Sequence, residues 1–140
     1  MKKNFMVGVT IAIMLLAGIS WAANLEKEKV AITAAKKWLA LTDAGKYSDS
    51  WKEAAEYFRN TVPQEQWKQM LQSVRAPLGK MLSRKIKTKE YKTSLPGVPD
   101  GEYVVIQFVT SYQNKKSAIE TVTPMLDKDG KWRVAGYYIK

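Results

Sequence analysis

The hydrophobic period of this chain changes once, near residue 80, and this change constrains the fold more than any other feature. Before it, apolar residues recur at three- and four-residue steps, as on one face of a helix. Beyond it, apolar and polar residues alternate, which is typical of strands. Pro77 and Gly79 mark the boundary. Helices followed by strands predict an α+β domain.

Three helices are predicted in the first half. Residues 25–44 form a long amphipathic helix that ends at Gly45 in a left-handed cap. Ser48 or Ser50 caps a second helix, and Thr61 caps a third. The side chains expected on the buried faces of the second and third helices are Trp51, Ala55, Phe58, Trp67, Met70, Leu71 and Val74.

Four strands are predicted in the second half. They cover roughly residues 82–93, 103–112, 117–126 and 131–139. The segment 127–130 ends in Asp-Gly, a hairpin-turn signature, and the other connections are also rich in turn-forming residues. We therefore expect a four-stranded antiparallel sheet with the three helices packed on one face.

The first 22 residues resemble a secretory signal. Two lysines precede an apolar run over residues 5–19, and Ser20 and Ala22 supply the small residues that a signal peptidase requires. The run is short for a membrane span. We expect cleavage before Ala23, which leaves one domain over residues 23–140 that is periplasmic or secreted and has no stable membrane span. The alternative is a retained N-terminal anchor.

Composition excludes much of enzyme chemistry. The chain has 140 residues, and none is Cys or His. This rules out disulfides, thiolate metal sites and the commonest general base. No glycine-rich phosphate loop, metal-ligand cluster or nucleophile elbow is found either. We expect no cofactor and no metal, and no residue is assigned as catalytic.

The formal net charge of +10 makes the chain strongly basic. Such a charge attracts anionic lipid or polymer, but it also serves simply to keep a small protein soluble. Nucleic acid is not expected as a partner, because no nucleic-acid-binding module is present. An anionic envelope component remains an alternative partner.

Several sequence blocks resemble known families. The blocks 75–79 (Arg-Ala-Pro-Leu-Gly), 94–97 (Ser-Leu-Pro-Gly), 101–108 and 120–125 are similar to the exported bacterial family named domain of unknown function 4019. The order of helices and strands, with the closing block 129–134, resembles the nuclear transport factor 2-like (cystatin-like) superfamily. These resemblances imply a curved sheet in a cone-shaped domain. They imply no single chemistry, because the superfamily holds isomerases, dehydratases, cyclases and binding modules.

Glu120 is the most suggestive carboxylate, because its neighbours on the same strand face are apolar. A charge in such a place is costly unless it is paired. Glu120 could carry a proton in a pocket, with tyrosines as hydrogen-bond donors. It could equally pair with Arg133 or with a lysine on a neighbouring strand. The candidate pocket residues are Glu120, Tyr112, Phe108 and Trp132.

The strand over residues 103–112 has two apolar sides. The better core set is Val104, Ile106, Phe108 and Thr110. The outward set is Tyr103, Val105, Gln107 and Val109, which we take as a candidate interface. This face suits a homodimer or another partner, although isolated exposed valines are an equally good explanation.

The sequence thus favours an uncharacterised exported binding or interaction module. It would hold a small apolar ligand in the cone or a protein partner on the open sheet face. One alternative is a cofactor-free isomerase- or lyase-like enzyme that uses Glu120. The other is a basic envelope protein that binds anionic lipid or polymer. A hollow cavity beside Glu120 would favour a pocket, and a filled interior would favour an interaction module.

Overall fold

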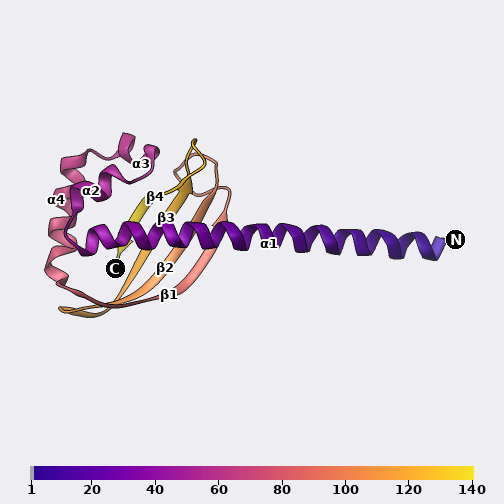
Figure 1. Ribbon diagram of the computed structural model, residues 1–140, viewed down its shortest axis with the longest axis horizontal. Coiled ribbons are helices and arrows are strands. Elements are labelled where there is room, and N and C mark those ends of the chain that lie inside the picture. Colours follow the sequence, from indigo (N-terminus) through magenta and orange to yellow (C-terminus); the bar gives the residue numbers. More distant parts are fainter. Residues whose placement is uncertain (1) are drawn as a thin grey trace.

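The computed structural model describes the backbone of residues 2–140 and the side chains of residues 20–140 (Figure 1). Its elements are α1 (Lys2–Asp43), α2 (Tyr47–Lys52), α3 (Glu56–Thr61), α4 (Gln64–Val74), the short 3₁₀ helix η1 (Ala76–Leu78), β1 (Met81–Lys92), β2 (Tyr103–Tyr112), β3 (Lys115–Leu126) and β4 (Trp132–Ile139). The α+β class and the four-stranded antiparallel sheet are confirmed.

The predicted signal peptide, residues 1–22, falls mostly outside the residues whose side chains are described, so it stays a prediction. Within the part of the chain that the structure describes, no helix is both long and apolar enough to cross a membrane.

The sheet has the strand order β1-β2-β3-β4, so β1 and β4 are its edges. Helix α1 crosses one face and contacts all four strands, while the shorter helices gather near its C-terminal end (Figure 1). The alternation predicted for β2 is confirmed on the helix side, where Val104, Ile106, Phe108 and Thr110 are buried. The other face of β2 carries the partly exposed Val105, Gln107 and Val109.

The end of α1 is capped as predicted. Gly45 has a positive φ of 74° and donates its N–H to Thr42 O at 3.1 Å. The next residue, Lys46, donates to Leu41 O at 2.9 Å. This pair of bonds is the Schellman motif, which satisfies the last carbonyls of a helix.

The predicted second helix is in fact two short helices, α2 and α3. The chain leaves the helical path between them so that Ala55 N–H donates to Val134 O at the edge of β4, at 2.8 Å. The serine cap was also wrong, because the residue before α2 is Lys46 and makes no side-chain cap. Ser50 instead lies buried in α2, where its hydroxyl accepts a hydrogen bond from Trp67 Nε1 at 3.0 Å. Thr61 makes no cap either, since Pro63 precedes α4.

Aromatic side chains fill the space between the helices and the sheet. The ring centroids of Trp38 and Tyr137 lie 5.3 Å apart, and those of Phe58 and Trp67 lie 4.9 Å apart in an edge-to-face arrangement. Burial of such large side chains supplies most of the hydrophobic stabilisation of a domain this small. The aromatic cluster therefore holds α1, α3, α4 and β4 together.

An irregularity in β1 changes which side chains face the helices. The pairing with β2 shifts between Ile86 and Thr88. As a result Lys89 turns toward α1, where its Nζ lies 3.6 Å from a Glu28 oxygen, while Lys85 pairs outward opposite Val109. Lys85 and Lys89 therefore lie on opposite sides of the strand, because a bulge reverses the facing of the residues beyond it.

Candidate functional site

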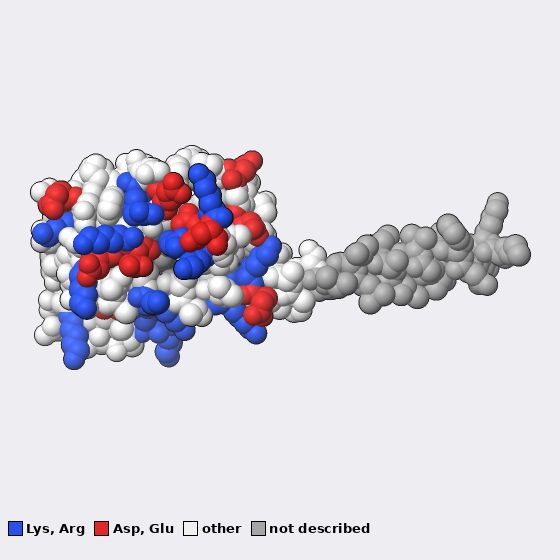
Figure 2. Space-filling model, turned by 45° about the horizontal axis from the view of Figure 1, so that its top comes forward, with Lys and Arg blue, Asp and Glu red and all other residues white. Residues whose placement is uncertain are grey.

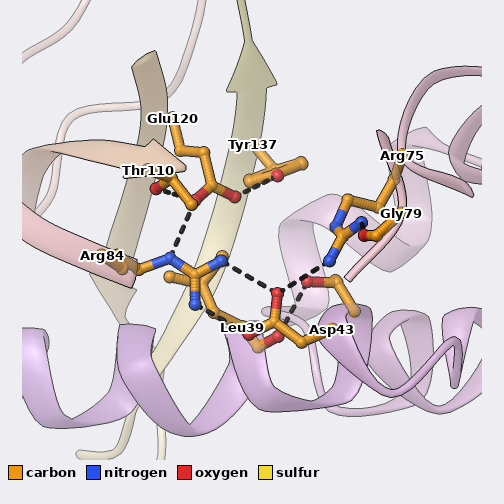
Figure 3. Close-up of polar contacts among 9 residues, drawn as sticks. Leu39, Asp43, Arg75, Gly79, Arg84, Thr110, Glu120 and Tyr137 are labelled. Carbon is orange, nitrogen blue, oxygen red and sulfur yellow. Dashed lines mark hydrogen bonds and ion pairs between the residues drawn. The ribbon is translucent and has the colours of Figure 1, made fainter. Parts of the chain in front are cut away.

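The carboxylate of Glu120 is wholly buried on β3 and is held by donors from three other strands (Figure 3). Its Oε1 accepts from Arg84 Nε at 2.8 Å and from the hydroxyl of Thr110 at 2.5 Å. Its Oε2 accepts from the hydroxyl of Tyr137. Burial and the nearby Glu120 charge both raise the pKa of Tyr137, so this tyrosine stays a neutral donor.

Arg84 extends this cluster to α1. Its two terminal nitrogens donate to Asp43 at 2.7 and 2.9 Å in a bidentate pair. Burial alone would lower the pKa of Arg84, but its hydrogen bonds to Asp43 and Glu120 outweigh burial and raise the pKa above its ordinary value. The guanidinium therefore remains charged and ties the sheet to the end of α1.

Arg75 completes the cluster from the end of α4. It donates to Asp43 at 3.3 Å and to Gly79 O at 2.7 Å, and its guanidinium lies 4.3 Å from the ring centroid of Tyr112. Two arginines thus face two carboxylates, and the four formal charges cancel. A buried ionic cluster is tolerated only when its opposite charges are paired in this way, because an unpaired buried charge is strongly destabilising.

The structure divides the predicted pocket residues between two places. Glu120, Phe108 and Tyr112 are buried in the interior. Trp132 is only partly buried and lines a separate groove, whose walls include none of the other three. Burial raises the pKa of Tyr112, and within the described side chains its hydroxyl has no hydrogen-bond partner.

Glu120 has a basic partner, but it is neither Arg133 nor a lysine, as was predicted. Arg133 binds Asp127 at 3.0 Å and Asp129 at 2.8 Å, at the β3–β4 turn. Glu120 is paired instead with Arg84, two strands away. The sequence analysis missed Arg84, Asp43 and Arg75. A signal existed, because Arg84 is the one arginine among the lysines of β1, and arginine is preferred to lysine in buried ion pairs.

The groove beside Trp132 lies between α1, α2 and the start of β4, and its volume is about 530 Å³. Trp38 and Leu41 of α1 form part of its floor, and Lys37 and Lys52 stand at its rim. Among the side chains that are described, no group of three or more acidic residues is placed to hold a metal ion.

The open face of the sheet carries most of the predicted interface. Val109 is 39% exposed, and it pairs with Ile119 on β3. Tyr138 on β4 is 63% exposed and extends the same face. Tyr103 differs from its predicted place, because it is buried and its hydroxyl donates to Pro99 O at 2.5 Å.

Charge is spread over the surface. Figure 2 shows basic and acidic side chains interspersed on one face of the domain. Surface charges are also paired across elements: Lys27 of α1 donates to Glu102 at 2.6 Å, and Tyr91 donates to the same oxygen at 2.8 Å. The hydrogen bonds from Lys27 and Tyr91 lower the pKa of Glu102. The net positive charge therefore does not form a single-sign field on this face.

These features define a small α+β domain with helices on one face of a four-stranded antiparallel sheet and a balanced ionic cluster inside it. Residues 34–137 match the family described as "Protein of unknown function (DUF4019)". This match covers most of the chain, so the protein belongs to that family, and the predicted family resemblance is confirmed. No curated protein and no solved structure matches the chain.

Proposed function

We propose that the protein is an exported interaction module that receives a protein partner on the open face of its sheet, with a second copy of the chain as the first candidate. The observation that carries this proposal is the exposure of Val109 and Tyr138 on the face that α1 does not cover. Partly exposed Val105 and Ile119 lie on the same face. Apolar and aromatic side chains grouped on an open sheet are typical of interfaces.

The interior of the domain gives less support to the competing functions. A ligand in the cone would need space beside Glu120, but aromatic rings and Arg84 pack there. An enzyme using Glu120 would need a carboxylate oxygen free for substrate, but both oxygens already accept hydrogen bonds. A role as a basic envelope protein rests on net charge alone, and basic and acidic residues alternate over the surface shown in Figure 2.

The resemblance to the nuclear transport factor 2-like superfamily, which is itself part of this proposal, supports the same function. In such cones the open sheet face is a common dimer surface. Export is part of the proposal and rests on the signal-like residues 1–22.

Substitution of Val109 by Lys tests the interface. We expect wild-type protein to dimerise and Val109→Lys to be a folded monomer, because an unpaired charge in an interface opposes association more than it disturbs one exposed strand position. Val74→Lys is the matched control, since Val74 is 44% exposed but lies at the end of α4. Sedimentation velocity measures the mass of each. Wild-type protein that stays monomeric at high concentration would overturn the dimer.

A further inference from the structure

The groove between α1, α2 and β4 lies among the helices, away from the open sheet face, so it is independent of the proposed interface. Its volume of about 530 Å³ falls within the range of roughly 300 to 1,000 Å³ that is usual for small-molecule sites. Neither the ionic cluster nor the open face accounts for it.

The floor of the groove is aromatic and preformed. Trp38 is 4% exposed, and its Nε1 donates to Ser50 O at 2.8 Å, which fixes the indole. Trp132, at the start of β4, is more exposed and offers a second indole. Trp132 therefore provides the accessible indole for a flat or apolar body, next to the fixed and nearly buried Trp38, and a fixed ring loses little entropy when a ligand binds.

The rim of the groove is predominantly cationic. Lys37, Lys52 and Lys131 come from three separate parts of the fold, and no ion pair is recorded for them among the described side chains. Arg133 also lines the groove, but Asp127 and Asp129 hold it.

Two carboxylates, Asp49 and Glu53, also line the groove, so three lysines face two acidic residues once Arg133 is set against Asp127 and Asp129. The positive charge of the whole chain adds to this local excess. Such a field favours anions and disfavours cations.

We propose that this groove binds a small organic anion. Its flat or apolar body would lie on Trp38 and Trp132, and its carboxylate, sulfonate or phosphate would lie among Lys37, Lys52 and Lys131. The ligand is a free molecule and not a membrane lipid, and the vesicle experiment below distinguishes the two sources.

Two fluorescent probes test this chemistry. The first, 8-anilinonaphthalene-1-sulfonate, has an aromatic body and a sulfonate, whereas N-phenyl-1-naphthylamine has nearly the same body without the charge. We expect saturable binding of the sulfonate, at least roughly tenfold tighter than that of the neutral amine and weaker at high salt. Equal affinity for the two probes, or no binding, would overturn the proposal.

Two triple variants locate the site. Lys37→Gln, Lys52→Gln and Lys131→Gln together should weaken sulfonate binding by roughly tenfold. The matched control replaces three exposed lysines outside the groove, Lys80, Lys87 and Lys116, by Gln, so the net charge is the same. This control should bind as wild type does. An equal loss in both triple variants would show only a general charge effect and would overturn the site.

Nuclear magnetic resonance and vesicles complete the test. The indole N–H signals of Trp38 and Trp132 should shift on titration with the sulfonate, while that of Trp51, whose Nε1 donates to Val62 O, should not. Unchanged Trp38 and Trp132 signals would place any binding elsewhere.

Sedimentation with vesicles of phosphatidylcholine and phosphatidylglycerol at 3:1 should leave the protein in solution. Vesicle binding that is lost in the groove variant would assign the site to a membrane surface instead.

Discussion

Arg84 donates from Nε to Oε1 of Glu120 at 2.8 Å, from the edge strand β1 to the buried centre of β3. The two residues are separated by β2, which places the small side chain Thr110 opposite Arg84 and leaves room for the long arginine to cross. A basic side chain from the edge of the sheet therefore neutralises a carboxylate that is fully buried.

The first prediction is that Glu120→Gln lowers the free energy of unfolding by about 2 to 4 kcal/mol. The amide has nearly the shape of the carboxylate, but it removes one of the two charges paired with Arg84 and places an N–H₂ group where an oxygen accepts a hydrogen bond. Thermal or urea unfolding at neutral pH measures the change. The matched control is Glu90→Gln, which alters an exposed pair with Lys92 and should change stability by less than about 0.5 kcal/mol. Equal stability of Glu120→Gln and wild type would mean that the cluster is not structural.

The second prediction concerns the β3–β4 turn. Hydrogen bonds from Arg133 and from the backbone of Lys131 lower the pKa of Asp129 to about 2. Arg133→Gln should bring the pKa of Asp129 back toward the ordinary value of 3.8. Titration of the carboxyl signal by nuclear magnetic resonance measures this. A pKa that stays near 2 in the variant would show that Arg133 is not the main cause.

The same pair has a consequence for acid stability. Because the pKa of Asp129 is lower in the folded chain than in the unfolded one, its contribution is complete above about pH 4 and is lost as the pH falls toward 2. Asp129→Asn should therefore make unfolding less sensitive to pH in that window. The carboxylate is exposed, so the effect should be small and should decrease at high salt.

The third prediction compares two glycines. Gly45→Ala should cost about 1 kcal/mol, because φ is +74° there and a side chain strains the backbone even though no atom lies within 4 Å of the added Cβ. Gly136→Ala should be neutral or slightly stabilising, since its φ is ordinary and the nearest atom lies at 3.9 Å. Unfolding curves of both variants measure the difference. A Gly45→Ala protein as stable as wild type would contradict the strain at the α1 cap.

The fourth prediction is cleavage between Ala22 and Ala23 on export. N-terminal sequencing of extracytoplasmic material should read Ala23 first. Ala22→Arg should block the cut, because signal peptidase requires a small residue there. Mature protein that keeps Met1 would show that residues 1–22 are not a cleaved signal.

The regular helices and strands could be predicted because the spacing of apolar residues along each of them follows the period of that structure. The four strands and the cap at Gly45 follow from alternation and from glycine chemistry. The break between α2 and α3 could not be found in this way, because it depends on a hydrogen bond from Ala55 to Val134, 79 positions apart. Ser50 was misread for a similar reason. A serine near a helix start resembles a cap, but here Trp67 uses its hydroxyl in the core.

Glu120 was predicted as a special residue because a carboxylate among apolar neighbours needs a partner. Its true partner could not be predicted, since the irregularity between Ile86 and Thr88 disturbs the alternation of β1 and hides which basic residues face inward. Trp132 was grouped with Glu120 as a candidate pocket residue. The structure places it instead where the strand begins, at the mouth of the groove.

Packing of α1 against the domain begins just beyond the expected cut. Ser20 to Ala23 are exposed, and the first partly buried side chain is that of Asn24. Farther along, Lys27 and Glu28 tie the helix to Glu102 and Lys89. Removal of residues 1–22 thus deletes none of the described tertiary contacts. Cleavage before Ala23, as proposed, would leave the ion pairs of Lys27 and Glu28 in place, so the mature domain would keep the described anchorage of α1 to the sheet.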